Sequence, residues 1–219
     1  MTMNSRRHTM WIMALAAVVL AAAPAAWAQK AQQKNIEDMT AFRTQVEAIR
    51  NQIDPVLNSL NAIVAAGNAS PSASYKTFAK ELSKMDDQVE QARKTKADMQ
   101  KKGEALFQEW EKKMGTITNP DIKAAAEANR AKLQELYKSI EPDVTAAKDA
   151  GAAFVTDLKD LNAYFQVDLS SSGIASMSST VTKCNSDGKT VQGLLDKILA
   201  TLDQVKAQMA PGGTGAAKK

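Results

Sequence analysis

The sequence is poor in the residues on which most enzyme and metal sites depend. It holds one cysteine, Cys184, and one histidine, His8. A single cysteine forms no disulfide within the chain. The chain therefore has too few cysteines and histidines for a zinc site or for a nucleophile activated by histidine. Glycine-rich phosphate loops of the GxGxxG or GxxxxGK(S/T) type are also missing. The sequence therefore predicts a protein that is not an enzyme and that binds no cofactor or metal ion.

The first 28 residues have the pattern of a cleavable secretory signal peptide. Arg6 and Arg7 form a basic start, residues 11–23 are uncharged and apolar, and residues 26–28 read Ala-Trp-Ala. We expect cleavage before Gln29 and a periplasmic or secreted protein. A membrane anchor is the alternative, but the apolar run is shorter than the roughly 20 residues that span a bilayer. The sequence leaves open the general secretory route and the twin-arginine route.

Strong charge of one sign is absent once the signal peptide is removed. The whole chain has a net charge of +4, and residues 1–28 contain two arginines and no acid, so the mature chain carries +2. This balance gives no sign of a nucleic-acid surface. It also disfavours binding to an anionic membrane surface, which remains an alternative because the helices are amphipathic.

Four segments repeat apolar residues at alternating steps of three and four, which is the period of helical bundles and coiled coils. They predict helices over about 32–66, 74–114, 120–168 and 172–209 of a single 29–210 domain. Segment 120–168 places on one face Ile122, Ala126, Leu133, Leu136, Ile140, Ala147, Phe154, Leu158, Leu161 and Phe165. The most regular stripe contains Ile174, Met177, Val181, Cys184, Gly188, Val191, Leu195, Ile198, Leu202, Val205 and Met209.

Prolines, glycines and capping residues divide these segments. Pro55 and Pro142 lie inside two of them and predict a kink or a break at each. Asn119-Pro120-Asp121 is the clearest helix start, because asparagine can cap, proline suits the first helical position and an acid suits the first turn. Residues 211–219 are rich in glycine and alanine and are expected to be a disordered tail.

Short turns between amphipathic helices favour antiparallel neighbours. The predicted fold is all-α, an elongated up-down-up-down four-helix bundle with coiled-coil-like packing. Two alternatives stay open: two long hairpins that dimerise, and a hairpin that extends as a coiled coil beyond a shorter bundle. The periodicity does not separate these three arrangements.

Cys184 lies in register on the apolar stripe of the fourth segment, which predicts a small core residue and not a reactive thiol. The surrounding residues 183–189 read Lys-Cys-Asn-Ser-Asp-Gly-Lys, a composition that weakens helices. Because the apolar spacing continues through them, we expect a frayed or bent helix there and not a ligand loop.

Trp110 is the only tryptophan after residue 28, and Phe107 lies three residues before it. Both are the candidate residues for a partner contact. The alternative interpretation is that Trp110 packs at the end of the bundle, because it continues the stripe of segment 74–114. Gly103 interrupts that stripe, and its missing side chain predicts room for a bulky residue of a facing helix.

The order of these features resembles a family of uncharacterised bacterial envelope proteins, known as a domain of unknown function and described as secreted or lipoprotein helical proteins. The resemblance covers roughly residues 35–209 and rests on Leu106, Phe107, Glu109, Trp110, Tyr137, Pro142, Val144, Phe154, Leu161 and Asn162. It implies a helical architecture and an envelope location. It implies no lipid anchor for this chain, because no cysteine follows the signal peptide.

Three functions are compatible with such a sequence. The first is a structural, scaffolding or protein-interaction module of the bacterial envelope, with an unknown envelope protein or a second copy as its partner. The second is a protein that lays its amphipathic helices on a membrane surface. The third is a holdase-type periplasmic chaperone that clasps clients between its long helices.

Overall fold

Four long helices and one short helix make up the computed structural model, which describes residues 22–66 and 71–209. The helices are α1 (Ala22–Ala66), α2 (Ser72–Met114), α3 (Pro120–Val167), α4 (Ser171–Ser176) and α5 (Ser178–Met209). These ranges contain no strand, and the predicted all-α class is confirmed.

Two of the regions that the sequence singled out fall partly or wholly outside the described residues. Residues 1–21 of the predicted signal peptide and the predicted tail 211–219 both lie outside the described ranges. The remaining signal-peptide residues, 22–28, form the first turns of α1. The signal peptide and the tail therefore stay predictions.

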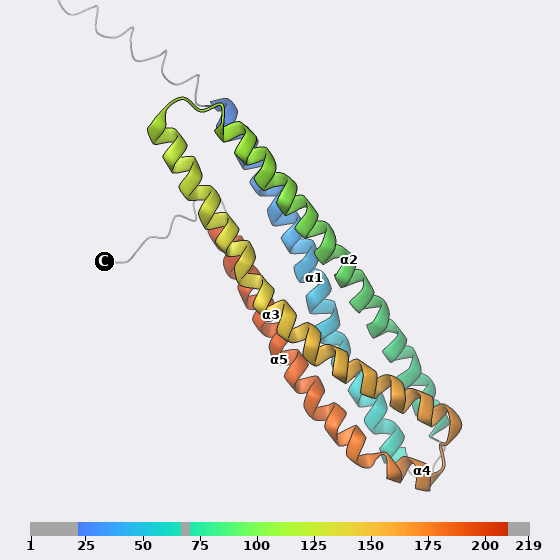
Figure 1. The fold of residues 1–219 in the computed structure, drawn as a ribbon. Helices are drawn as coiled ribbons and strands as arrows, with labels where there is room; N and C mark the ends of the chain where they lie inside the picture. The colour runs from blue at the N-terminus through green and yellow to red at the C-terminus, as the bar shows by residue number, and fades with distance from the viewer. Residues whose placement is uncertain (1–21, 67–70, 210–219) are drawn as a thin grey trace, which may run out of the picture.

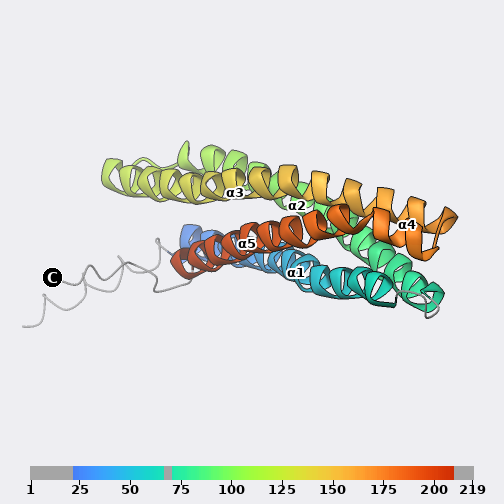
Figure 2. The same cartoon turned by 90° about the horizontal axis from the view of Figure 1, so that it is seen from below.

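The long helices run side by side in alternating directions (Figure 1). α1 packs against both α2 and α5, and α3 packs mainly against α5. α2 and α3 follow each other in the chain, yet they approach each other least closely of these neighbours. In Figure 2, α3 lies on one side of the molecule and α1 and α5 on the other, whereas α2 crosses from the side of α3 to the side of α1.

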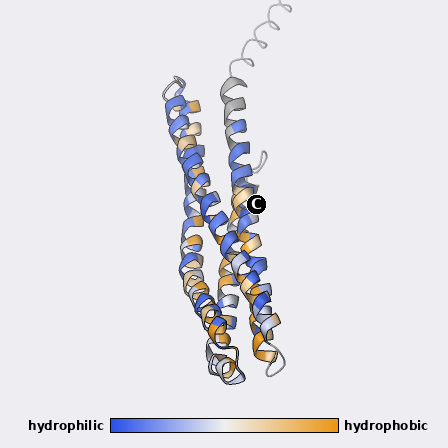
Figure 3. Ribbon diagram, turned by 90° about the vertical axis from the view of Figure 1, so that its right-hand side faces the viewer, coloured by the Kyte–Doolittle hydropathy of each residue, from blue (hydrophilic) through white to orange (hydrophobic). Residues whose placement is uncertain are grey.

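The core is formed by the stripes that the periodicity predicted. Apolar positions recur along every helix between hydrophilic ones (Figure 3). The largest fully buried side chains are Phe78, Phe154, Phe165, Met39, Ile53, Leu60, Ile63, Met85, Leu158, Leu161 and Leu202. All four long helices contribute to a single cluster of buried side chains, so no helix is a separate unit.

Four polar pairs fix how α1 lies against α5. They are Arg43–Asp203, Arg50–Asp196, Asp54–Gln192 and Asn61–Asn185. Successive pairs are seven, four and seven residues apart on α1, and the same steps separate them in the reverse direction on α5. Equal steps of seven and four are the signature of antiparallel helices in constant register. Each exposed ion pair contributes little, about 0–1 kcal/mol, so the pairs specify register more than they stabilise.

Long charged side chains bridge the wider seam between α2 and α3. The ion pairs are Lys159–Asp86, Lys96–Glu141 and Arg130–Glu111. Arginine and lysine reach across such a distance because their aliphatic stems lie along the apolar surface while their charged ends stay in water.

Neither internal proline interrupts its helix. Pro55 lies within α1 and Pro142 within α3, and both helices continue on either side. The break that the sequence allowed at these positions does not occur. α3 changes direction between its ends (Figure 1), which agrees with the bending that proline produces by removing one backbone hydrogen bond.

The predicted helix 172–209 is instead two helices separated by Met177. The backbone of Met177 has φ −92° and ψ 0°, and its N–H donates to the carbonyl of Ile174, a tighter turn than an α-helix makes. Ahead of it, the Ser170 hydroxyl caps α4 by accepting from the N–H of Gly173. The Asp168 carboxylate lies where a Cβ on Gly173 would be, so a larger residue at this position would push that side chain aside.

The predicted start of α3 is confirmed. The side chain of Asn119 accepts hydrogen bonds from the backbone N–H groups of Asp121 and Ile122, at 2.9 and 3.2 Å. Pro120 takes the first helical position. These bonds satisfy two of the donors that every helix start leaves unpaired, and they fix where the α2–α3 hairpin turns.

Candidate interaction surface at the end of the α2–α3 hairpin

The α2–α3 hairpin extends past the end of α5 (Figure 1). The hydroxyl of Thr201 on α5 donates to Asp143 on α3 at 2.9 Å, which sets the two helices at the same level. α5 ends eight residues later, at Met209. Eight residues in the opposite direction along α3 lead to Glu135. At about 1.5 Å per residue, α3 therefore runs roughly 20 Å beyond α5. We call residues 106–133 the tip.

The exposed fraction of the apolar side chains on one face of α3 increases toward the N-terminus of α3, beyond the level where α5 ends. Ile140, still opposite α5, is 3% exposed, and Leu133, just beyond its end, is 9% exposed. Ile122, on the same face, is 56% exposed. The sequence placed Ile122 among core positions, and this expectation is wrong because α5 ends before it reaches the first turns of α3.

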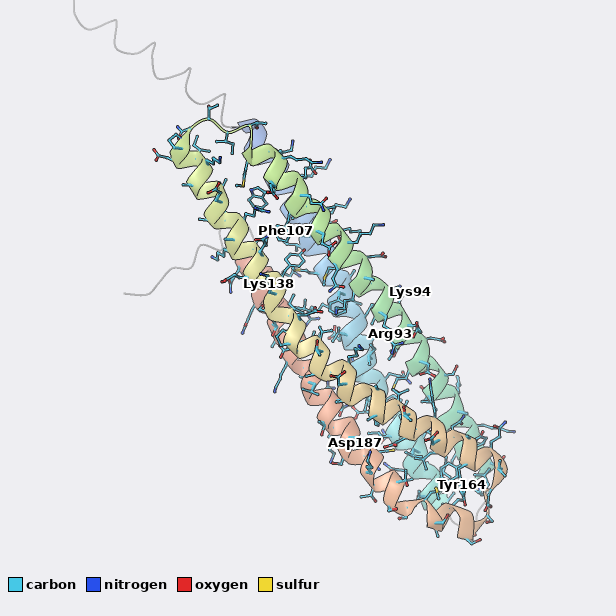
Figure 4. All side chains as sticks on the ribbon, viewed as in Figure 1. Arg93, Lys94, Phe107, Lys138, Tyr164 and Asp187 are labelled. Carbon is cyan, nitrogen blue, oxygen red and sulfur yellow. The ribbon has the colours of Figure 1, made fainter. Side chains whose placement is uncertain are left out.

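The two residues predicted as partner contacts, Phe107 and Trp110, both lie in the tip. Each is half-buried and packs against the core. The ring of Phe107 meets Tyr137 of α3 edge-on, with 5.7 Å between ring centres. Figure 4 shows Phe107 between α2 and α3 near the turn that joins them. Phe107 and Trp110 thus combine packing against the core with partial exposure.

Tyr137 marks the base of the tip, where three helices still meet. Its ring lies against Gly103 of α2, which confirms the predicted room beside this glycine. Its hydroxyl donates to the Asn35 side chain of α1 at 3.0 Å. Asn35 is 4% exposed. A buried asparagine is costly unless it is hydrogen-bonded, so the bond from Tyr137 stabilises the contact between α1 and α3.

A pair of opposite charges lies one turn along α1 from this contact. Lys102 of α2 donates to one oxygen of Asp38, and this bond raises the pKa of Lys102. The other oxygen of Asp38 is enclosed and has no hydrogen-bond partner among the described residues. Burial, and to a lesser extent the charge of Asp38, raise the pKa of Tyr137, so the phenol stays neutral. Because the phenol stays neutral, Tyr137 keeps the proton that it donates to Asn35.

A shallow hollow of about 300 Å³ opens between α1 and α2 at the same level. Its lining combines both signs of charge with an apolar floor: Lys30, Lys34, Asn35, Asp38, Lys102, Ala105, Leu106 and Glu109. The hollow shows that α1 and α2 also separate toward this end of the molecule. The end with the turn between α2 and α3 is therefore the more open end.

Cys184 lies far from the tip and is fully buried in α5. Burial raises its pKa from 9.0 to about 11, which keeps the thiol protonated and unreactive at neutral pH. The predicted core position is confirmed. The weak helical stretch around it is regular helix, within α5. Gly188 there lets α1 approach closely, since a Cβ would lie 2.7 Å from Leu57.

Metal sites and membrane spans are both absent from residues 22–66 and 71–209. No three His, Cys, Asp or Glu side chains gather there as a metal site would require. Between residues 22 and 209, apart from 67–70, none of the helices has both the length and the apolar character to cross a bilayer. The other strongly exposed large apolar side chain is Val167, at 89%, and it lies at the opposite end of α3.

Comparison with known proteins places the chain in a family. The family model described as "Protein of unknown function (DUF2959)" matches residues 29–210. The chain belongs to the DUF2959 family. The resemblance to a domain of unknown function is thereby confirmed. Neither the curated proteins nor the solved structures contain a match to this DUF2959 chain.

The family match covers the whole bundle, including the tip. Reasoning from the sequence of this DUF2959 member found Phe107 and Trp110 but missed Ile122. The lengths of the predicted helices could have indicated that Ile122 is exposed. Segment 120–168 is longer than segment 172–209, and the two share the turn between them, so the first turns of the longer helix have no partner in an antiparallel pair. No sequence signal pointed to the bond between Tyr137 and Asn35.

Proposed function

We propose that this chain is a non-enzymatic, exported helical protein that acts as a scaffolding or protein-interaction module of the bacterial envelope. In this proposal its four long helices form an elongated up-down-up-down bundle with coiled-coil-like packing. The tip is the part that meets a partner, through Phe107, Trp110 and Ile122.

The observation that carries the proposal is the rising exposure of one apolar stripe beyond the end of α5. Elsewhere the stripes of the helices cover one another, as a bundle requires. Ile122 is a large apolar side chain that the described chain leaves 56% exposed. A partner that covers this stripe would stabilise both molecules by removing apolar surface from water.

The charged side chains support a role in architecture. Most ion pairs among the described residues join neighbouring helices, such as Arg50–Asp196 and Lys159–Asp86. The single cysteine, Cys184, is a buried core residue. Export is part of the proposal because of the N-terminal pattern ending at residue 28, which the family match to residues 29–210 follows directly.

Crosslinking and affinity capture from the envelope test this proposal. The bait is the chain that begins at Gln29, as wild type, as Ile122→Asp and as Val167→Asp. The last variant is a matched control, because it changes an exposed apolar residue at the other end of the same helix. We expect capture of a defined partner by the wild type and by Val167→Asp, and its loss with Ile122→Asp. Equal capture by all three baits would contradict a role for the tip.

A further inference from the structure

We propose that residues 120–132, the first turns of α3, are a conformational switch that opens while the rest of the bundle stays folded. We call these residues the switch segment. In the open state the segment loses its helix and leaves α2, which uncovers Trp110 for a partner. This inference rests on the proposed function, because it concerns the regulation of the same surface.

The switch segment contributes no buried side chain to the molecule. All its residues are exposed except Ala126 and Arg130, which are half-buried. Buried side chains of α3 begin at Leu133, directly after the segment, and recur at Ile140 and Ala147. Most of the stability of a helix in a protein comes from packing one face against other elements. The switch segment lacks this stabilisation, whereas the rest of α3 has it.

The contacts of the switch segment with other helices are weak. Among the described helices, α3 packs against α5 and, less closely, against α2. Because α5 ends before it reaches the segment, α2 is the neighbour that remains. Arg130 of the segment pairs with Glu111 of α2 at 3.1 Å, but the Glu111 side chain is 69% exposed. Water weakens such an exposed ion pair, so it holds the segment loosely.

Arg130 also carries a cost in the closed state. Its Nε is enclosed and has no hydrogen-bond partner among the described residues. An enclosed donor without an acceptor is destabilising, because it has given up its hydrogen bond to water. When the segment leaves α2, water reaches this group again. Opening therefore breaks an exposed ion pair and restores a hydrogen bond to the same side chain.

Local sequence features hold the switch segment in a helix. Five of its 13 residues are alanine, the residue with the highest helix propensity. Asn119 caps the helix by accepting from the backbone N–H groups of Asp121 and Ile122. Isolated helices shorter than about 12–15 residues are marginal in water even when they are rich in alanine. A segment of this length and composition therefore lies close to a balance between helix and coil.

The base of the tip limits how far the opening extends. Leu133 belongs to the buried core cluster. One turn further along α3, Tyr137 donates to Asn35 of α1 and lies against Gly103 of α2. These contacts tie α3 to two other helices at the same level. The opening consequently stops at Leu133, and the helix beyond it stays folded.

The position of the ion pair shows what the opening uncovers. Glu111 follows Trp110 directly, so its bond to Arg130 places the switch segment beside α2 at the level of Trp110. Trp110 is half-buried in the closed state. When the segment leaves, this part of α2 loses a neighbour and the exposure of Trp110 increases. Tryptophan is enriched among the residues that dominate protein interfaces. The open state is therefore the state that we expect a partner to bind.

Hydrogen exchange of the purified chain beginning at Gln29, followed by NMR, tests the switch. Amides of residues 123–132 should exchange about a hundredfold or more faster than those of residues 154–165, each relative to its rate in an unfolded chain. Both ranges lie in α3, so they differ in packing and not in the type of structure. Equal protection of the two ranges would overturn the inference, because α3 would then open only together with the bundle.

Two variants should shift the switch in opposite directions. Asn119→Ala removes the cap and should speed the exchange of residues 123–132 about fivefold. Asn129→Ala raises helix propensity at an exposed position and should slow it about threefold. Ser170→Ala is the matched control, because it removes the cap of α4 and should leave the segment unchanged. Unchanged exchange at residues 154–165 shows that the bundle stays folded. Changes in the same direction for the two asparagine variants would overturn the switch.

Crosslinking and affinity capture from the envelope test the regulation. With the same three variants as baits, Asn119→Ala should capture more of the partner than the wild type and Asn129→Ala less. Ser170→Ala should match the wild type. Equal capture by all baits would overturn the role of the open state in binding.

The switch and the proposed function can fail separately. Fast exchange at residues 123–132, with no partner captured by any bait, would support the opening and overturn the interaction role. Capture that is lost in Ile122→Asp, with residues 123–132 as well protected as residues 154–165, would support the interaction role and overturn the switch.

Discussion

The ring of Tyr137 occupies the space that a side chain at position 103 would fill. Its Cε1 lies 3.1 Å from the place that a Cβ on Gly103 would take. The glycine therefore lets α2 and α3 approach each other at the base of the tip, although the two helices are more widely spaced elsewhere. This contact anchors the tip to the rest of the molecule.

Replacing Gly103 with leucine should force the ring of Tyr137 aside. We expect the free energy of unfolding to fall by about 1–3 kcal/mol, the usual cost of overpacking. Urea denaturation measures it. The same replacement in a Tyr137→Ala background should cost less, because the obstructing ring is gone. An equal cost in both backgrounds would show that the ring is not the obstacle.

Gly188→Ala should destabilise the protein through the contact between α5 and α1. The added Cβ would lie 2.7 Å from Leu57 Cδ1 and 3.3 Å from Ile53 and Phe154, so at least one side chain must move. We expect a loss of about 1–3 kcal/mol. Gly193→Ala in the same helix is the control, since its Cβ would meet nothing within 4 Å. It should raise stability by about 0.5–1 kcal/mol, because glycine weakens a helix interior. A loss in both variants would contradict this assignment.

Cys184 should be inert toward thiol reagents in the folded protein. It is fully buried, and its pKa is raised to about 11, so little thiolate is present at pH 8. With an aromatic disulfide reagent we expect no fast reaction under native conditions and complete reaction in denaturant. A fast native reaction would place the thiol at the surface.

Stability should fall at alkaline pH. In the folded chain, the pKa of Tyr137 lies above its ordinary 10.0, and the pKa of Cys184 is raised from 9.0 to about 11. Because both groups hold their protons more tightly when folded, their contribution is complete below the ordinary values. It is lost as the pH rises through the folded-state values.

Urea denaturation of the Tyr137→Phe variant over pH 8–11 isolates the contribution of the tyrosine. At pH 8 we expect a loss of about 0.5–1.5 kcal/mol, because Asn35 loses its donor. Above pH 10 the stability of the variant should fall less steeply than that of the wild type. Parallel curves for the two proteins would show that Tyr137 does not titrate in this range.

Trp110 should report on the packing of the tip as the single tryptophan of the chain that begins at Gln29. It is half-buried and packs against the core. We expect native emission at a shorter wavelength than that of free tryptophan, with a shift to longer wavelength on unfolding. Native emission at the wavelength of solvated tryptophan would contradict the packing seen here.

Periodicity predicted which face of each helix is buried, and it predicted little about what lies opposite. Cys184 was assigned correctly because its whole helix has a partner. Ile122 has the same kind of position in its stripe, yet it is exposed because α5 ends before reaching it. The pattern of one helix carries no information on the length of its neighbour.

Long-range polar contacts were beyond the reach of the sequence. The partner of Lys102 is Asp38, 64 residues away, and Asn35 meets Tyr137 only because α1 and α3 lie at matching levels. The separation at Met177 was also missed, because it depends on a backbone turn that leaves the apolar spacing unchanged. Local sequence signals predicted local structure correctly, as at the helix cap formed by Asn119.

Photocrosslinking in intact cells tests the role of the tip most directly. A photoreactive benzoylphenylalanine replaces Ile122 in one strain and Val167 in another, so that both ends of α3 are probed at exposed apolar positions. Irradiation should give a discrete crosslinked product from position 122 and none from position 167. No product at position 122, or the same product from both positions, would contradict an interaction surface at the tip.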